Sequence, residues 1–141
     1  MKHRVMLFIE GRQSYDAQEP EIIQLTTEGT MAFREGGWDI RYEESALTGL
    51  EGVTTTFRVE PGKVVLTRTG RLNSEMIFEQ GVPHDSLYEM EFGALLLTVQ
   101  ATSVFYDVLP DGGSIDLSYT LNIEHTLAGV IDYHLDIRAL E

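Results

Sequence analysis

The sequence contains no cysteine among its 141 residues, and it contains only two lysines, Lys2 and Lys63. The absence of cysteine excludes disulfides, thiolate nucleophiles, iron–sulfur clusters and cysteine-ligated zinc. Positive charge is scarce as well, since ten Lys and Arg stand against 23 Asp and Glu, for a net charge of −13. Nucleic acids and anionic membranes are bound through clustered Lys and Arg, so this balance argues against both as partners.

Long apolar runs are also missing. The basic start at residues 2–4 is followed by only five apolar residues, 5–9, before Glu10. A signal peptide needs roughly 7–15 apolar residues and a membrane-spanning helix about 20, so we predict neither and expect a cytoplasmic protein. The length suits one domain, residues 1–141, which can fold without a disulfide or a metal. No phosphate-binding loop or dinucleotide motif is present, and no cofactor is expected.

Apolar and polar residues alternate with period two through most of the chain, whereas the 3.6-residue period of a helix is hard to find. Such stripes are typical of strands with one face on a core and the other in water. Turn-forming glycines and prolines separate the stripes. The only plausible helix is a short turn near residues 16–19. Ten strands are predicted, at residues 3–12, 21–35, 37–46, 52–60, 63–71, 74–81, 85–92, 94–109, 113–125 and 128–140.

Hairpin-length connections join these segments, so neighbours in sequence should pair as antiparallel neighbours in space. Ten strands in a meander leave two exposed edges unless the sheet closes on itself. We therefore predict an all-β fold, a single closed or nearly closed up-and-down antiparallel barrel, with a two-sheet sandwich as the alternative. Segments 21–35 and 94–109 are long enough to require a bend or bulge, and Gly29 is a candidate for the bend.

A set of short motifs, in their order and spacing, resembles the YwiB-like family of small uncharacterised bacterial proteins, over residues 38–133. The resemblance implies a ten-strand calycin-like barrel of the lipocalin and fatty-acid-binding type, and it brings no established activity. Fatty-acid-binding proteins hold a carboxylate with Arg-x-Tyr on the last strand, whereas here Arg138 is followed by Ala139 and Leu140. The motifs are Tyr42-Glu43-Glu44, Arg68-Thr69-Gly70, Phe78-Glu79-Gln80-Gly81, Tyr88-Glu89-Met90-Glu91-Phe92-Gly93 and Ile115-Asp116-Leu117-Ser118-Tyr119.

Two charged residues share the inward phase of their strands. Glu44 continues the stripe of Trp38, Ile40 and Tyr42, and Arg68 continues the stripe of Val64 and Leu66. A charge inside a barrel is costly unless it is paired, so we expect Glu44 and Arg68 to face each other. The pair is either a polar floor that orients a ligand, with Arg68 meeting an anionic group, or a structural ion pair at one end of the barrel.

The leading functional hypothesis is a non-enzymatic barrel that binds a small, partly apolar molecule in its interior. Ten strands leave more room than the eight that side chains alone can fill. The alternative is a protein-interaction module with a side-chain-filled barrel and no ligand. The candidate ligand-binding residues are Glu44 and Arg68 for polarity, with Tyr42, Phe78, Tyr88, Met90 and Tyr119 as walls.

We predict neither a catalytic nor a metal site. Asp132, His134 and Asp136 alternate on the outward face of the last strand, but they lack a fourth ligand and are interpreted as a solvated face. The pair His84 and Asp85 lies in an expected loop with no convincing nucleophile beside it.

A homodimer is a further possibility. Met6, Phe8 and Ile22 are apolar on the phase opposite the inward stripe of their strands. Strands that are apolar on both faces suggest that something covers the outer face, such as a second subunit or the ends of the chain itself.

Overall fold

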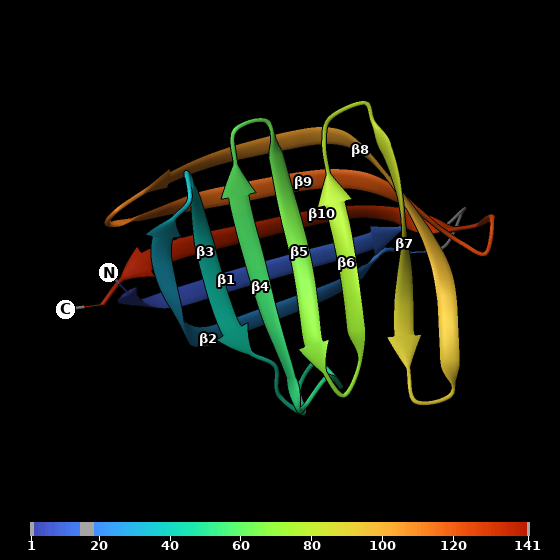
Figure 1. The fold of residues 1–141 in the computed structure, drawn as a ribbon, viewed down its shortest axis with the longest axis horizontal. Coiled ribbons are helices and arrows are strands. Elements are labelled where there is room, and N and C mark those ends of the chain that lie inside the picture. The colour runs from blue at the N-terminus through green and yellow to red at the C-terminus, as the bar shows by residue number, and fades with distance from the viewer. Residues whose placement is uncertain (1, 15–18, 141) are drawn as a thin grey trace.

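The computed structural model describes residues 2–14 and 19–140, which form ten antiparallel strands closed into a barrel (Figure 1). The helical turn expected near residues 16–19 falls mostly outside the described residues. Each strand pairs with its neighbours in sequence, and β1 pairs with β10 to close the ring. The closed up-and-down barrel is therefore confirmed, and the two-sheet sandwich is wrong. The strands are β1 (Lys2–Ser14), β2 (Glu21–Arg34), β3 (Gly37–Glu43), β4 (Val53–Glu60), β5 (Lys63–Gly70), β6 (Asn73–Phe78), β7 (Pro83–Met90), β8 (Gly93–Leu109), β9 (Gly112–Ile123) and β10 (Thr126–Ala139).

Burial follows the period-two stripes. Along β4, the buried residues are Val53, Thr55, Phe57 and Val59, and the residues between them are only partly buried. The same alternation on the other strands fills the middle of the barrel with apolar side chains. The largest fully buried side chains are Phe57, Phe78, Leu7, Met31, Ile40, Ile115, Leu117 and Leu135.

The long strands run along one side of the barrel, and β3 to β6 cross the molecule on the other side (Figure 1). The pairing of β2 with β3 starts only at Thr30–Arg41, so residues 21–29 of β2 have a ladder partner on the β1 side alone. Gly29 lies at this junction, where a Cβ atom would be 2.4 Å from the carbonyl oxygen of Arg41. A glycine is needed there because two backbones approach closely.

The other long strand carries a bulge. The ladder between β8 and β9 shifts its register between Ala101 and Ser103, and the ladder between β9 and β10 shifts between Leu127 and Gly129. A bulge inserts one unpaired residue and increases the local twist, which lets a strand as long as β8 follow the curved wall. The bend or bulge expected within residues 94–109 is confirmed.

Two strands end three residues earlier than the sequence predicts. β3 ends at Glu43 and β6 at Phe78, whereas the alternation suggested ends at residues 46 and 81. After β3, the chain forms a loop of residues 44–52, in which Gly49 and Gly52 have positive φ angles of 76° and 88°. Arg71 anchors this loop, because its Nε donates to the carbonyl of Glu51 and its Nη2 donates to that of Gly49.

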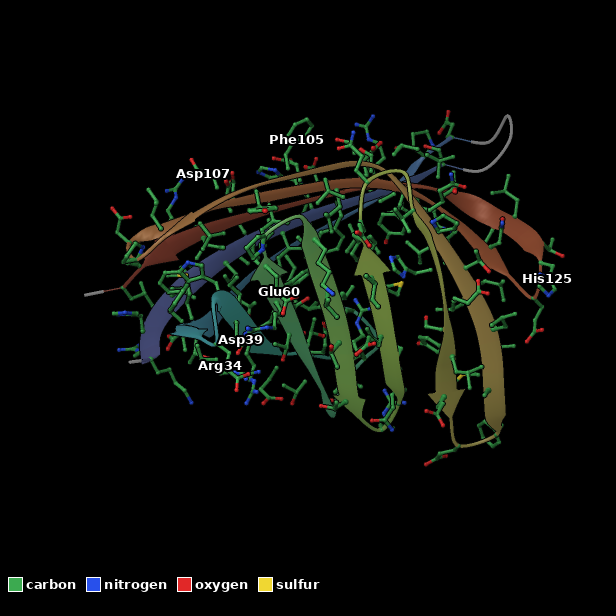
Figure 2. All side chains as sticks on the ribbon, turned by 45° about the horizontal axis from the view of Figure 1, so that its top comes forward. Arg34, Asp39, Glu60, Phe105, Asp107 and His125 are labelled. Atoms are coloured by element: carbon green, nitrogen blue, oxygen red, sulfur yellow. The ribbon has the colours of Figure 1, made fainter. Side chains whose placement is uncertain are left out.

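Charged side chains on the outside are closely paired around Arg58. Its guanidinium donates to Asp39 over 3.1 Å, to Glu60 over 2.9 Å and to the carbonyls of Arg34 and Glu35 over 2.9 and 3.0 Å. Figure 2 shows Arg34, Asp39 and Glu60 gathered at this end of β2 to β4, while Phe105 and Asp107 project from β8 elsewhere. Within the described residues, no helix is long and apolar enough to cross a membrane.

Candidate functional site

Five inward-facing residues with polar atoms lie side by side across five strands. They occupy successive positions in the ladders from β3 to β7, so each is the direct cross-strand partner of the next. The neighbouring inward row, which lies two residues away on each strand, is apolar, because Phe57 pairs with Ile40 on one side and with Leu66 on the other. The polar row therefore marks where the apolar filling of the barrel stops. Its members are Tyr42, Thr55, Arg68, Ser74 and Tyr88.

Glu44 lies next to the polar row, just after the end of β3. Its backbone N–H donates to the carbonyl of Val53 over 2.8 Å, which extends the ladder by one bond and keeps the side chain turned inward. The side chain is only 1% exposed. Its carboxylate accepts a hydrogen bond from the Thr48 hydroxyl at Oε1 over 2.9 Å and another from the Thr55 hydroxyl at Oε2 over 2.5 Å.

Arg68 faces Glu44, as the shared inward phase predicts. Its Nε lies 3.8 Å from Oε2 of Glu44, a separation that gives charge attraction but exceeds hydrogen-bonding distance. The Nε–H is buried and has no hydrogen-bond partner among the described residues. The Arg68 side chain as a whole is 17% exposed. The pair is thus electrostatically matched, while the buried Nε–H of the guanidinium is left without a partner among the described residues.

These two residues form the floor of a pocket of about 160 Å³ at the open part of the barrel. The unpaired half of β2 contributes one wall and the loop of residues 44–52 another, so the pocket lies where β2 and β3 have separated. Most of its lining is apolar, and the polar atoms are concentrated at the floor. The lining residues are Ile9, Gly11, Ile23, Leu25, Tyr42, Glu44, Thr48, Leu50, Arg68 and Tyr133.

Three tyrosine hydroxyls near this floor remain protonated at neutral pH. Burial, and next the negative charge of Glu44, raises the pKa of Tyr42 to about 12. Burial also raises the pKa of Tyr133, with the charge of Tyr42 as the second cause. The pKa of Tyr119 is raised by burial, and the positive charge of Arg68 acts against the shift. The hydroxyls of Tyr42 and Tyr133, which line the pocket, can therefore donate hydrogen bonds to a bound molecule, whereas Tyr119 does not line it.

The remaining predicted wall residues lie elsewhere. Phe78 and Tyr119 are buried, with ring centroids 4.7 Å apart, and they help to fill the barrel. Tyr88 and Met90 line a separate depression of about 260 Å³ beside Phe92, and Met90 is 38% exposed. Placing Met90 on the inner wall was wrong, because β7 ends at this residue and the strand's inward phase there meets solvent instead of core.

Sequence reasoning missed Thr48, Thr55 and Tyr133 as parts of the site. Thr55 carried a signal, since it is a hydroxyl residue on the inward stripe between Val53 and Phe57. Tyr133 also lies on the inward stripe of its strand. Thr48 carried no periodic signal, because it belongs to a loop, and only the folded loop brings its hydroxyl to the carboxylate of Glu44.

The outward face of β10 is occupied by hydrogen-bonded charges. His134 contacts Asp116 through Nδ1 over 2.5 Å and Asp136 through Nε2 over 3.0 Å, and the hydrogen bond with Asp116 is the main cause that raises the pKa of His134. Asp132 accepts instead from Ser118. Across residues 2–14 and 19–140, no group of three or more His, Asp and Glu side chains is arranged to hold a metal ion.

The residues considered for catalysis have other partners. His84 contacts Glu79 through Nε2 over 3.1 Å, and Asp85 accepts a hydrogen bond from the Thr98 hydroxyl over 2.7 Å. These contacts hold β7 to its neighbours in the barrel. The pocket lined by Tyr42, Glu44 and Arg68 therefore remains the candidate binding site.

Comparison with solved structures gives the same fold. The structure described as "Crystal structure of ywiB protein from Bacillus subtilis" matches with a TM-score of 0.88 and 21% sequence identity, over 99% of this chain and 94% of that one. At this level of identity, the match shows a shared architecture, that of a closed ten-strand barrel.

Sequence comparison agrees with the resemblance drawn from the spaced motifs. The "Uncharacterized beta-barrel protein YwiB" of Bacillus subtilis (strain 168) is 26% identical over 108 residues, which cover 77% of this chain and 75% of the relative. The profile of the family described as "Domain of unknown function (DUF1934)" matches residues 8–137. Since that match spans nearly the whole barrel, the chain belongs to the DUF1934 family.

Proposed function

We propose that this barrel is a non-enzymatic binding protein that holds a small, partly apolar molecule in the pocket above Glu44 and Arg68. The observation that supports the proposal is the pocket itself, which has apolar walls over a desolvated pair of opposite charges. Binding sites for small molecules combine an apolar lining with a few convergent polar groups in this way. A volume of about 160 Å³ is close to that of an engineered cavity that accepts benzene, roughly 150 Å³. The ligand is accordingly small.

The test is to identify what the protein carries. The protein is purified from the cells that make it, and small molecules released on denaturation are identified by mass spectrometry. Two variants of the same loop provide the comparison. Leu50→Trp fills the pocket, whereas Leu47→Trp changes a side chain that is 86% exposed and lies outside it. We expect a released compound from the native protein and from Leu47→Trp, and none from Leu50→Trp. Equal release from all three proteins would contradict the proposal.

A second candidate function is protein interaction through a filled barrel. The middle of the barrel is packed, and a second depression near the end of β7 is lined by Leu50, Leu72, Tyr88, Met90 and Phe92, together with Arg71 and Glu91. Phe92 is 95% exposed, which is unusual for a phenylalanine without a partner. A protein captured from lysate that is lost with Phe92→Glu and kept with Leu25→Trp, which changes the ligand pocket but not this depression, would favour this function over ligand binding.

We also propose where the protein acts and which partners it has. The net charge of −13 supports a cytoplasmic protein without nucleic-acid or membrane partners. We also propose a weak homodimer. Of the apolar residues Phe8 and Ile22 on the outer face, only Ile22 supports it. Arg138 lies over the ring of Phe8, 5.0 Å from its centroid, so Phe8 needs no second subunit to cover it. Ile22 remains 50% exposed on the unpaired half of β2. Sedimentation equilibrium that shows only monomer at high micromolar concentration would exclude the dimer.

A further inference from the structure

The two charged groups at the pocket floor differ in how well their hydrogen-bonding capacity is used. Glu44 accepts one hydrogen bond at each carboxylate oxygen, from Thr48 and from Thr55. Arg68 carries five N–H donors, and no described residue accepts a hydrogen bond from its buried Nε–H. A molecule entering the pocket therefore meets a guanidinium with an unused donor beside a carboxylate that already accepts two hydrogen bonds. A polar group that accepts hydrogen bonds is the one that satisfies Arg68.

The charge of that acceptor is limited by Glu44. The carboxylate already stands 3.8 Å from the guanidinium and balances it, so the floor is neutral as a unit. A second carboxylate would bring two negative charges to one arginine in a chain of net charge −13. An ammonium group would bring a second positive charge beside the Arg68 guanidinium and could not accept from its N–H groups. An uncharged carbonyl oxygen fills the donors and leaves the charge balance unchanged.

The walls of the pocket determine what the rest of the ligand must be, beyond its polar group. Ile9, Ile23, Leu25 and Leu50 surround the space above the floor with aliphatic groups. The buried Ile9 and the partly buried Leu25 and Leu50 limit the water around the carbonyl–guanidinium contact, while Ile23 is 57% exposed at the rim, and a lower local dielectric strengthens such a hydrogen bond. The pocket volume of about 160 Å³ accommodates a body of about one six-membered ring.

We propose, building on the binding function proposed above, that the ligand is an uncharged carbonyl compound of about one ring in size, with its oxygen on the Arg68 guanidinium and its apolar body among Ile23, Leu25 and Leu50. Arg68 is then the residue that determines ligand class, and Glu44 excludes acids. This assignment differs from the anionic group that the sequence suggested for Arg68, because the charge of Glu44 already balances that of Arg68 at the pocket floor.

Four probes of similar size test the assignment: cyclohexanone, cyclopentanecarboxylate, cyclohexylammonium and methylcyclopentane. Binding to the full chain is followed by NMR through the Nε–H signals of the arginines. Arg58 provides an internal control, because its side chain is about as buried, at 15% exposed, and its Nε already donates to Glu60. We expect cyclohexanone to shift the Arg68 signal, leave the Arg58 signal in place and bind about tenfold more tightly than methylcyclopentane, which is the effect of about one charge-assisted hydrogen bond.

Variants separate this inference from the binding function on which it rests. The double variant Glu44→Gln/Arg68→Met removes both charges together, and it should bind cyclohexanone and methylcyclopentane equally. Arg41→Met, on the outward face of β3, should keep the tenfold preference. Tightest binding of the carboxylate or the ammonium would overturn the carbonyl assignment and leave the binding function standing. Failure of all four probes to shift any pocket signal at millimolar concentration would overturn both.

Discussion

Arg58 and Arg68 lie on adjacent strands and are almost equally buried, at 15% and 17% side-chain exposure, yet their surroundings differ completely. Arg58 lies on the outer face and makes four hydrogen bonds, two to carboxylates and two to backbone carbonyls. Arg68 lies on the inner face, and its buried Nε–H has no partner among the described residues. The free-energy cost of burying the guanidinium is offset by hydrogen bonds at Arg58 and only by charge attraction to Glu44 at Arg68.

The difference distinguishes an arginine that completes a structure from one that is available to a ligand. Buried polar groups are nearly always hydrogen-bonded, so an unfilled donor at a pocket floor calls for an explanation. Beside Arg58, Gly37 leaves no room for a Cβ atom, which would lie 2.8 Å from the carbonyl oxygen of Val59 and 2.9 Å from Nη2 of Arg58. Perturbing the two sites separately tests this contrast.

The largest effect is expected from removing the inner carboxylate. Glu44→Leu leaves Arg68 without its counter-charge and the Thr55 hydroxyl without its acceptor, and we expect a loss of about 3 kcal/mol in the free energy of unfolding. The combined variant Glu44→Leu/Arg68→Met should recover most of that loss, because it removes both charges. Urea denaturation of the single and double variants measures this coupling. If the losses in the free energy of unfolding simply add in the double variant, Glu44 and Arg68 are not energetically coupled.

A smaller loss is expected on the outer face. Arg58→Met removes four hydrogen bonds from a network that water partly reaches, and we expect a cost of about 1–2 kcal/mol. Ligand binding in the pocket should be unchanged, since Arg58 is not part of its lining. The same denaturation series, together with probe titrations, provides the measurement. A change in probe affinity equal to that of an Arg68 variant would remove the distinction between the two arginines.

The pKa of the tyrosine at the pocket floor reports on the inner charges. The pKa of Tyr42 is about 12 because of burial and the charge of Glu44, while the charge of Arg68 opposes the shift. Glu44→Gln should therefore lower the pKa of Tyr42, and Arg68→Met should raise it further. Arg58→Met should not change it. Titration of the ¹³Cζ signals of labelled tyrosines follows each hydroxyl, and opposite shifts would refute this charge arrangement.

The smallest effect is expected at an exposed charge cluster. The pKa of His134 is raised by its hydrogen bond with Asp116, so this pair stabilises the fold fully at pH below about 6.5. The stabilisation is lost as the pH rises through the pKa of His134 in the folded state. Because the His134 side chain is 41% exposed, solvent screening limits the effect to about 0.5 kcal/mol. His134→Gln should reduce stability at pH 5.5 and have no effect at pH 9, and a uniform loss would argue against protonation as the cause.

The sequence was sufficient to predict the architecture and the central pair of the site. Ten strands, their order and the inward positions of Glu44 and Arg68 followed from period-two alternation, because alternation directly reflects which face of a strand is buried. The pocket itself could not be predicted. Its walls depend on where β2 separates from β3 and on how the loop of residues 44–52 folds back, and neither has a periodic signal. Met90 was misplaced for a related reason, since alternation does not show where a strand leaves the core.

Ring closure has a consequence for how the chain folds. Every ladder but one joins strands that follow each other in sequence and can form as a local hairpin, whereas β1 and β10 pair from Val5–Ala139 to Ser14–Val130 across almost the full chain. Contacts of such large sequence separation slow folding, because loop-closure entropy must be overcome before they form. During synthesis, β1 has to wait for the last strand to leave the ribosome. Until then, its buried-side residues Val5, Leu7 and Ile9 lie on an open edge, where pairing with another nascent chain competes with closure.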